Sequence, residues 1–232
     1  MKRVFGLVFT VFLVPAVVVA APVNLVINGD FSAGNTGFIS DYAPVGANTE
    51  GMYPPGVYTV DTSAVDDHDL WVTGGDHTTG TGNFMLVNGF TSTPNLLVWS
   101  QTLAVTAMTD YFFEAFTNNL CCNAAAGGGP APPTANLSFL INGLLVGSGG
   151  AMGAPGFWTG ISTMWNSGSA TTAVLQIRDS AIDFGGNDFG IDDVYLGTQS
   201  TVNPVPEPFS MLLLGSGLAM VAKGVRGKRK VM

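Results

Sequence analysis

Short apolar runs separated by turn residues constrain the fold of this chain more than any other sequence feature. Leu137–Ile141 and Leu144–Val146 flank Asn142-Gly143, a dipeptide that favours the two positive φ angles of a type I′ hairpin turn. In Leu96–Val105 large apolar residues alternate with smaller or polar ones, which is the period of a strand with one buried face. No stretch between the two chain ends keeps a helical period, so we expect an all-β fold.

The same pattern predicts about ten short strands along the chain, because each apolar run ends at Gly, Pro, Asn or Asp. We expect these strands at residues 24–28, 57–60, 83–87, 96–105, 111–117, 137–141, 144–146, 157–165, 172–178 and 189–196. Residues 40–56 and 118–134 are expected to be long loops. Many short strands with such turns are typical of a β-sandwich or jelly roll, here over residues 22–200.

The N-terminal segment has the features of a secretory signal peptide. Lys2 and Arg3 precede the apolar stretch Val4–Val19, and small residues suited to signal peptidase follow at Ala20 and Ala21. We therefore expect residues 1–21 to form a signal helix that signal peptidase removes. The remaining body has the size of one domain and can bury a hydrophobic core.

The C-terminal segment, residues 203–230, contains three blocks in a fixed order. Val205-Pro206-Glu207-Pro208 comes first, the apolar run Phe209–Ala222 follows, and a cluster of Lys and Arg ends the segment. The two prolines favour an extended, exposed backbone that a processing enzyme can bind. The apolar run favours lipid, although it is shorter than the roughly 20 residues of a full membrane span, and the basic cluster favours the cytoplasmic side.

This order of blocks resembles the PEP-CTERM sorting signal of Gram-negative bacteria. The resemblance implies processing at Val205, Pro206, Glu207 and Pro208 by an exosortase, a membrane transpeptidase. It also implies a short transmembrane helix that anchors the chain transiently in the inner membrane. The mature protein would then reach the cell surface or the extracellular biofilm matrix. An ordinary C-terminal membrane anchor is the alternative interpretation.

Charge separates the body from the two terminal segments. Between Pro22 and Pro204 the sequence has one basic residue, Arg178, and fifteen acidic residues, so its net charge is about 1 − 15 = −14. Such a body argues against nucleic acid as a partner, because that ligand requires clustered Lys and Arg. It favours cations, above all Ca²⁺, which takes oxygen ligands. The alternative is that the acidic residues only keep an exported protein soluble.

The two ends of the body carry a second resemblance. Asn24-Leu-Val-Ile-Asn28-Gly-Asp-Phe31 opens the body and Phe189-Gly-Ile-Asp192-Asp193-Val-Tyr-Leu196 closes it, with Gly82–Gly89 and Asp110–Phe116 between them. In this order the motifs resemble galactose-binding-like jelly rolls, especially carbohydrate-binding modules of the CBM4/9/22 kind. Asp76-His-Thr-Thr-Gly is also similar to a stretch of MAM-type jelly rolls. The resemblance implies glycan binding to an extracellular polysaccharide.

The same resemblance implies a structural Ca²⁺ where the first and last strands meet. Its ligands would be Asn28, Asp30, Asp76 and Asp192. This sequence departs from the family pattern at Ser32, where Glu is common, so Asp30 or Asp76 would have to supply the missing carboxylate. The alternative is that Asp192 only ends a strand.

Aromatic and catalytic candidates are few. Trp71 and Trp158 lie beside glycine-rich loops, where an indole can stack on a sugar ring, whereas Trp99 and Trp165 lie in strand-like stretches and are expected in the core. The body has two histidines and no nucleophile elbow, so we expect no enzymatic activity. Glu114 is expected to face solvent from an apolar strand.

Cys121 and Cys122 are adjacent, and three states are open for an exported chain: a vicinal disulfide, bridges to other molecules, or two free thiols. Our leading hypothesis is an exported, non-catalytic jelly roll that binds glycan and is stabilised by calcium. The alternatives are a purely structural or adhesive matrix component without specific sugar binding and, third, a hydrolase.

Overall fold

The computed structural model describes residues 21–122, 135–150, 154–182 and 187–202. Pro22–Pro204 form one compact unit. The expected signal helix (apart from Ala21), the apolar C-terminal run and the processing motif lie outside the described residues. Within the described ranges, no helix is long and apolar enough to cross a membrane.

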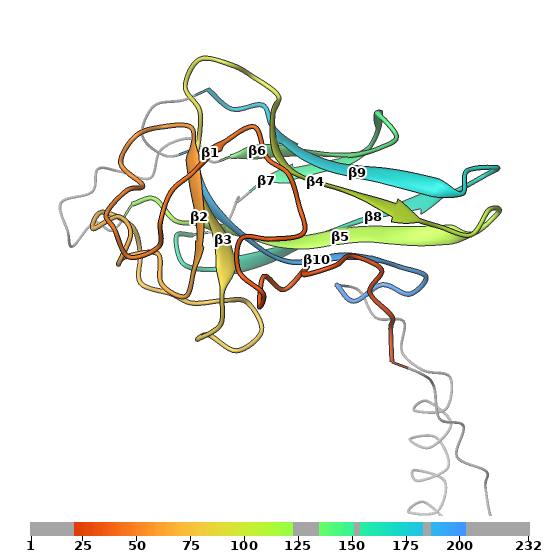
Figure 1. Ribbon diagram of the computed structural model, residues 1–232, viewed down its shortest axis with the longest axis horizontal. Coiled ribbons are helices and arrows are strands. Elements are labelled where there is room, and N and C mark those ends of the chain that lie inside the picture. The colour runs from red at the N-terminus through yellow and green to blue at the C-terminus, as the bar shows by residue number, and fades with distance from the viewer. Residues whose placement is uncertain (1–20, 123–134, 151–153, 183–186, 203–232) are drawn as a thin grey trace, which may run out of the picture. The chain divides into compact units, whose positions relative to one another are not determined.

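The body is all-β in its described residues, as the sequence predicts (Figure 1). One sheet has the order β1-β2-β3-β10-β5-β8 and the other has the order β4-β9-β6-β7. The strands are β1 (Ala43–Pro44), β2 (Val57–Asp61), β3 (Phe84–Asn88), β4 (Leu96–Ala104), β5 (Asp110–Asn119), β6 (Asn136–Ile141), β7 (Leu144–Gly150), β8 (Trp158–Asn166), β9 (Thr172–Asp179) and β10 (Asp188–Gly197).

The connectivity is jelly-roll-like. β1, β2 and β3 follow one another within the six-stranded sheet. After β3 the described strands alternate between the two sheets, except that β6 and β7 both belong to the four-stranded sheet. The paired strands are antiparallel except for β1 and β2. This crossing places β10, the last strand, between β3 and β5 in the six-stranded sheet.

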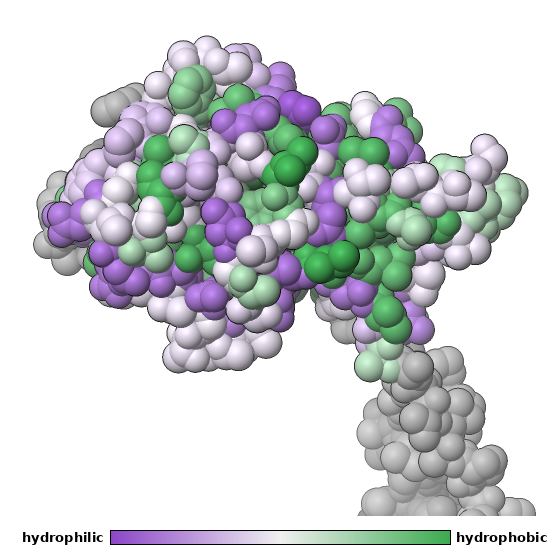
Figure 2. All heavy atoms as spheres, in the orientation of Figure 1, coloured by the Kyte–Doolittle hydropathy of each residue, from purple (hydrophilic) through white to green (hydrophobic). Residues whose placement is uncertain are grey.

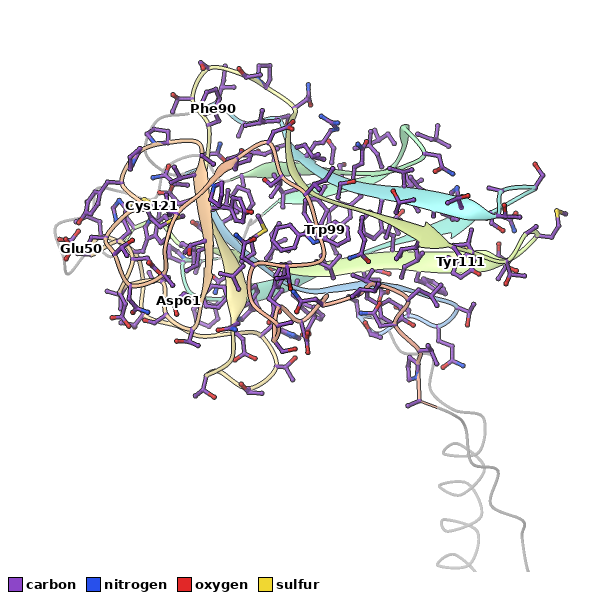
Figure 3. The ribbon with its side chains drawn as sticks, viewed as in Figure 1. Glu50, Asp61, Phe90, Trp99, Tyr111 and Cys121 are labelled. Atoms are coloured by element: carbon purple, nitrogen blue, oxygen red, sulfur yellow. A yellow bond between two sulfur atoms is a disulfide. The ribbon has the colours of Figure 1, made fainter. Side chains whose placement is uncertain are left out.

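The main hydrophobic core lies between the two sheets. Trp99 on β4 and Phe139 on β6 come from one sheet, and Phe113 on β5 and Ile191 on β10 come from the other; all four side chains are fully buried. The rings of Phe113 and Phe139 meet edge-to-face with centroids 5.1 Å apart, and Figure 3 shows Trp99 between the sheets. Burial of each such side chain stabilises the fold by roughly 1.5–3 kcal/mol.

The Asn-Gly hairpin forms as predicted between β6 and β7. Asn142 has φ 53° and Gly143 has φ 77°, the positive values that a type I′ turn requires. The Asn142 side chain also accepts a hydrogen bond from the N–H of Val174 on β9 (2.8 Å). The turn therefore joins its hairpin to the neighbouring strand.

The opening segment differs from the prediction. Residues 24–28 do not form a ladder strand, but Leu25 N–H donates to the carbonyl of Leu196 on β10 (2.9 Å). The Asn24 side chain replaces further ladder bonds: its Nδ2 donates to the carbonyl of Val194 (2.9 Å) and its Oδ1 accepts from Leu196 N–H (3.1 Å). The first and last segments of the body therefore lie side by side.

One loop prediction also needs correction. The long loop at residues 40–56 contains β1, which pairs in parallel with β2. The short apolar stretch at residues 70–72 forms one isolated bridge, between Trp71 and Cys121.

Glu114 is buried, and the prediction that it faces solvent is wrong. Its carboxylate accepts hydrogen bonds from the hydroxyls of Ser162, Ser200 and Thr201 and from the N–H of Thr201 (2.7 Å). Burial alone would raise the pKa of Glu114, but these donors together hold it below its ordinary value. The carboxylate thereby fastens the segment after β10 to β5 and β8.

Candidate functional site

Acidic residues from three distant segments line one cavity of about 220 Å³. Asp30 comes from the opening segment, Asp76 from the loop before β3, and Asp192 and Asp193 from β10. We call these four residues and their cavity the acidic junction. Because Val194 N–H donates to the carbonyl of Gly29 (2.8 Å), the opening segment is held beside β10 at this point.

The Asp76 loop is folded around its own carboxylate. Asp76 Oδ1 accepts from Gly82 N–H (2.7 Å) and from the Thr79 hydroxyl (2.8 Å), and Oδ2 accepts from Thr79 N–H (2.9 Å). Burial would raise the pKa of Asp76, but these donors hold it below its ordinary value. Asp76 therefore carries its negative charge readily, although it uses much of its acceptor capacity within the loop.

Asp192 is the most deeply buried member of the acidic junction, with 1 % of its surface exposed. It accepts hydrogen bonds from His77 N–H and Asp193 N–H (both 2.8 Å). Burial, reinforced by the neighbouring Asp193 carboxylate, raises the pKa of Asp192 to about 7. Asp193 in turn accepts from the Thr78 hydroxyl and contacts His77 Nδ1 (both 2.7 Å).

Asn28, predicted from the resemblance to be a ligand, does not line this cavity. Its Nδ2 donates to the carbonyls of Gly34 (2.9 Å) and Thr36 (2.8 Å), and its Oδ1 accepts from Ala33 N–H (2.8 Å). These bonds fold the turn that carries Asp30. Asn28 therefore shapes the loop, and its side chain is not directed to the acidic junction.

Ser32, where the carbohydrate-binding modules that the sequence resembles commonly have Glu, donates two hydrogen bonds to the carboxylate of Asp30. Its N–H (3.2 Å) and its hydroxyl (2.9 Å) both donate to Asp30 Oδ1. Ser32 also lines the cavity. Ser32 thus contributes a hydroxyl to the acidic junction, where Glu would contribute a carboxylate.

The donor chemistry of the acidic junction suits a hard cation. Carboxylates, hydroxyls and the Asn83 amide line the cavity, and oxygen atoms are the ligands that Ca²⁺ prefers. In the described part of the chain, however, no three His, Cys, Asp or Glu side chains converge closely enough to hold an ion. Coordination here would therefore need main-chain carbonyls, hydroxyls or water beside the carboxylates.

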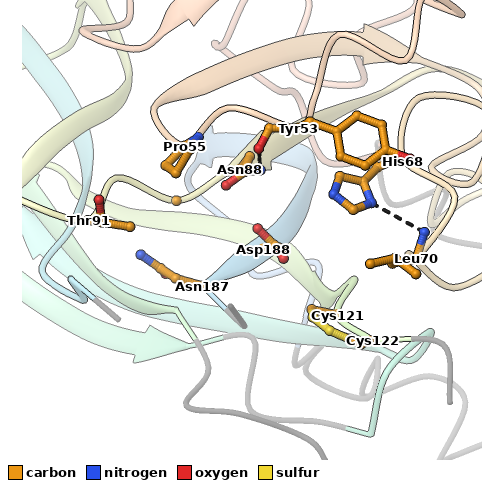
Figure 4. A pocket seen from close by; sticks show the side chains of 11 residues that line it. Tyr53, Pro55, His68, Leu70, Asn88, Thr91, Cys121, Cys122, Asn187 and Asp188 are labelled. Atoms are coloured by element: carbon orange, nitrogen blue, oxygen red, sulfur yellow. Dashed lines mark hydrogen bonds between the residues drawn. A yellow bond between two sulfur atoms is a disulfide. The ribbon is translucent and has the colours of Figure 1, made fainter. Parts of the chain in front are cut away.

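A second cavity, of about 240 Å³, lies where β3 and β5 end and β10 begins (Figure 4). We call it the end pocket. Its walls combine aromatic, amide, carboxylate and sulfur groups. It is lined by Tyr53, Pro55, His68, Leu70, Asn88, Gly89, Thr91, Cys121, Cys122, Asn187 and Asp188.

Three aromatic rings are stacked at the end pocket. Tyr53 stacks on His68 with centroids 4.2 Å apart, and His68 stacks on Trp71 at 4.9 Å. Tyr53 is 45 % exposed, whereas Trp71 is fully buried. The prediction that Trp71 stacks on a ligand is therefore wrong, because Trp71 belongs to a smaller hydrophobic cluster with residues such as Leu86 and Leu120.

His68 is neutral at pH 7, because burial lowers its pKa. Its Nδ1 accepts a hydrogen bond from Leu70 N–H (3.3 Å), drawn in Figure 4. An imidazole that is neutral and accepts at Nδ1 carries its proton on Nε2. His68 therefore provides one hydrogen-bond donor in the wall of the end pocket.

Asp188 and Asn88 supply the polar side of the pocket. Asp188 is 8 % exposed, and burial raises its pKa to about 6 although the Trp71 side chain and Gly89 N–H oppose the shift. Asn88 Nδ2 donates to the carbonyl of Met52 (2.6 Å), which fixes the amide and leaves its Oδ1 as an acceptor. Asp188 lies at the centre of the residues drawn in Figure 4.

The structure contains the vicinal disulfide among the three states open to Cys121 and Cys122. Both residues line the end pocket, and Cys121 is buried. The disulfide therefore forms part of the pocket wall.

Trp158, the second predicted ligand contact, is half-buried. Its Nε1 donates to the carbonyl of Gly75 (3.2 Å), and its ring meets Phe84 edge-to-face at 5.5 Å. Neither Trp71 nor Trp158 lines the end pocket. The tryptophan pattern missed Tyr53, which the sequence places in a Pro-rich loop and which the structure exposes.

No family model and no curated protein matches the sequence. Solved structures do show similar folds, among them a Stig cyclase from Fischerella sp. TAU in complex with an indole compound (10 % identity, TM-score 0.49, covering 76 % of this chain and 97 % of that chain). Two others are TmCBM61 in complex with β-1,4-galactotriose (13 %, 0.46, covering 76 % and 99 %) and a family 16 carbohydrate-binding module (14 %, 0.40, covering 75 % and 99 %). At these identities and TM-scores, the similarities say nothing about the ligand of this chain.

Proposed function

We propose that this chain is an exported, non-catalytic binding module that holds one neutral sugar unit of an extracellular polysaccharide in the end pocket. One observation carries the proposal: Tyr53 is 45 % exposed at the rim of a pocket that also presents the His68 ring and the Asp188 carboxylate. An exposed aromatic face binds the apolar face of a sugar ring, and nearby polar groups bind its hydroxyls.

Size and charge define the class of ligand. The cavity of about 240 Å³ is smaller than the roughly 300–1,000 Å³ of sites for drug-sized ligands, so it suits a single ring. Among the described residues no Lys or Arg lines it, whereas Asp188 does. An anionic sugar would meet an uncompensated carboxylate, so a neutral sugar is favoured.

Replacing Tyr53 with alanine tests this site. We expect Tyr53→Ala to weaken sugar binding by about 10- to 100-fold, because the lost stacking surface contributes roughly 1.5–3 kcal/mol. Oligosaccharides chosen from an array of neutral, acidic and amino sugars would be titrated by calorimetry. Phe157→Ala is the matched control, since Phe157 is 68 % exposed outside the pocket. Equal affinities of Tyr53→Ala and the unchanged protein would contradict the proposal.

A purely structural matrix component is the second candidate. It is favoured by the absence, among the described residues, of a tryptophan platform, since Trp71 is buried and Trp158 is only partly exposed. Hydrophilic and hydrophobic residues are also interspersed on the face in Figure 2. The sugar array distinguishes the two functions. If the folded protein binds no sugar on the array, the structural function is supported.

We also propose that the acidic junction holds a structural Ca²⁺. One or two carboxylates of Asp30, Asp192 and Asp193 would ligate the ion, and hydroxyls and main-chain carbonyls of the Asp76 loop together with water would provide the other oxygens. A bound ion would offset the mutual repulsion of these groups and fasten the opening segment to β10. Its role here is to hold the fold, and binding of sugar does not pass through it.

Export and sorting complete the proposed function. Signal peptidase would remove residues 1–21, and an exosortase-like transpeptidase would act at Val205-Pro206-Glu207-Pro208 after transient insertion in the inner membrane. The sequence order of these segments supports this route. The mature body would then reside at the cell surface or in the extracellular matrix.

Altering the processing motif tests the route. In cells that contain an exosortase, we expect Glu207→Ala to retain its C-terminal segment and to stay in the membrane fraction, since the enzyme would lose its recognition residue. Intact-mass measurement and fractionation would check both effects. Ser210→Ala, a change within the apolar run, is the control. Normal processing of Glu207→Ala would show that the segment is an ordinary anchor.

A further inference from the structure

A second pair of carboxylates lies apart from the acidic junction. Asp61 ends β2, and Asp67 follows in the next turn. Asp67 is completely buried and Asp61 is 6 % exposed. Figure 3 shows Asp61 on the side of the molecule where Glu50 and Cys121 also lie.

Three of the four carboxylate oxygens in this pair lack a hydrogen bond. They are Asp61 Oδ2 and both oxygens of Asp67; the fourth, Asp61 Oδ1, accepts from Thr62 N–H (2.6 Å). The N–H groups of Asn48 and Thr49 lie near enough to lower the pKa of Asp67, but neither makes a hydrogen bond of normal geometry. Buried polar groups are almost always satisfied, so three such oxygens together indicate an absent partner.

The Asp61 carboxyl lies within hydrogen-bonding reach of Asp67. Burial raises the pKa of Asp67 to about 7, and the adjacent Asp61 carboxyl adds to the shift. No Lys or Arg is available to neutralise them, because the sole basic residue of the body, Arg178, donates to the carbonyl of Asn95 (2.9 Å). Only a shared proton or a bound cation can relieve such a pair.

We infer that Asp61 and Asp67 form a second cation site, which takes an oxygen-ligated divalent ion of the Ca²⁺ class. Asp67 offers both oxygens and Asp61 offers Oδ2, and the loop at Asn48 and Thr49 lies against them. Water would complete the six to eight oxygen ligands that Ca²⁺ takes. The site shares no residue with the acidic junction.

Binding at this pair would fasten the covering loop to β2. The loop already contacts the strand, because Val45 N–H donates to the carbonyl of Tyr58 (2.9 Å) and the Thr59 hydroxyl donates to the carbonyl of Val45 (3.0 Å). Shortly after the loop the chain reaches Met52 and Tyr53. The ion would therefore steady the segment that carries the exposed ring of the end pocket.

Counting bound calcium tests the inference. The full chain, purified in mild detergent and stripped with chelator, is equilibrated with Ca²⁺, and bound metal is measured by calorimetry and elemental analysis. We expect Asp67→Asn to bind one ion fewer than the unchanged protein. The neighbouring exposed residue supplies the matched control, Asp66→Asn, which should keep the full number.

If Asp67→Asn binds as many calcium ions as the unchanged protein, the inference is overturned. Asp61 and Asp67 would then be a carboxyl pair that shares a proton. If Asp67→Asn does not fold, Asp192→Asn decides the matter. An ion that remains bound to Asp192→Asn supports the second site, whereas loss of all bound calcium in that variant overturns it. The count is independent of the sugar titration with Tyr53→Ala, so failure of one proposal can be told from failure of the other.

Discussion

Removal of calcium is expected to lower the melting temperature of the protein by roughly 5–10 °C. An ion that binds only the folded chain stabilises it by about 2.7 kcal/mol when free calcium is about 100 times its dissociation constant. For a domain of this size each kcal/mol shifts the melting temperature by roughly 2–4 °C. Calorimetric scans with calcium and with chelator would measure the shift.

The physical reason is the placement of the acidic junction between chain segments far apart in sequence. Asp30 precedes β1, whereas Asp192 lies in the last strand. Without a cation the buried Asp192 faces the carboxylates of Asp193 and Asp76, which raise its pKa in addition to the effect of burial. An ion would replace repulsion between these groups by shared coordination and would join the ends of the body.

Variants separate the contribution of this junction from that of the Asp61–Asp67 pair. Asp192→Asn should lose a large part of the calcium-dependent shift, and the double variant with Asp67→Asn should lose all of it. Asp110→Asn, a change at an exposed carboxylate, should respond like the unchanged protein. Identical melting temperatures with calcium and with chelator for the unchanged protein would contradict both proposed metal sites. If the calcium-dependent shift in melting temperature persists in Asp192→Asn but is lost in Asp67→Asn, only the metal site at the acidic junction is contradicted.

Replacing Glu114 with glutamine should reduce the free energy of unfolding by roughly 3 kcal/mol at pH 7. The change removes a buried charge from among hydroxyl and N–H donors of Ser162, Ser200 and Thr201, and hydrogen bonds to charged groups contribute roughly 1.5–3 kcal/mol each. Urea unfolding would measure the loss. Glu50→Gln, at an exposed loop position, should change stability little.

The pH dependence of this effect has a definite sign. The pKa of Glu114 in the folded chain lies below its ordinary value of 4.5. The carboxylate therefore stabilises the fold fully above that value, and the contribution is lost as pH falls through the folded-state pKa. The difference in stability between the unchanged protein and Glu114→Gln should shrink in acid. A constant difference from pH 7 to acid would show that the loss comes from packing and not from charge.

Local features of the sequence predicted much of the fold. The hairpin at Asn142-Gly143 and the strand at 96–104 form where expected, because turn angles and strand propensity depend on neighbouring residues. The predicted alternation of buried and exposed residues appears only at its C-terminal end, since residues 97–101 are all buried. The segment at 24–28 does not form a ladder strand, since the Asn24 side chain makes bonds that a neighbouring backbone would otherwise make.

The acidic junction was partly predictable. The order of the motifs led us to expect that Asp30, Asp76 and Asp192 meet, and the structure places all three around one cavity. Asn28 was predicted with them, but its amide is used in the turn that it starts. Asp193, the remaining carboxylate of the cavity, could have been found from its position beside Asp192.

The sequence alone therefore determined the class of fold, most of the strand positions and the acidic character of the body, because these follow from periodicity, turn chemistry and charge. Only the tertiary structure decided which polar and aromatic groups are buried and which are exposed. Trp71 is enclosed while Tyr53 is open, and Glu114 and Asp67 are buried although their residue types favour solvent. Burial depends on segments that are distant along the chain, such as Thr201 against Glu114, and no local pattern records those contacts.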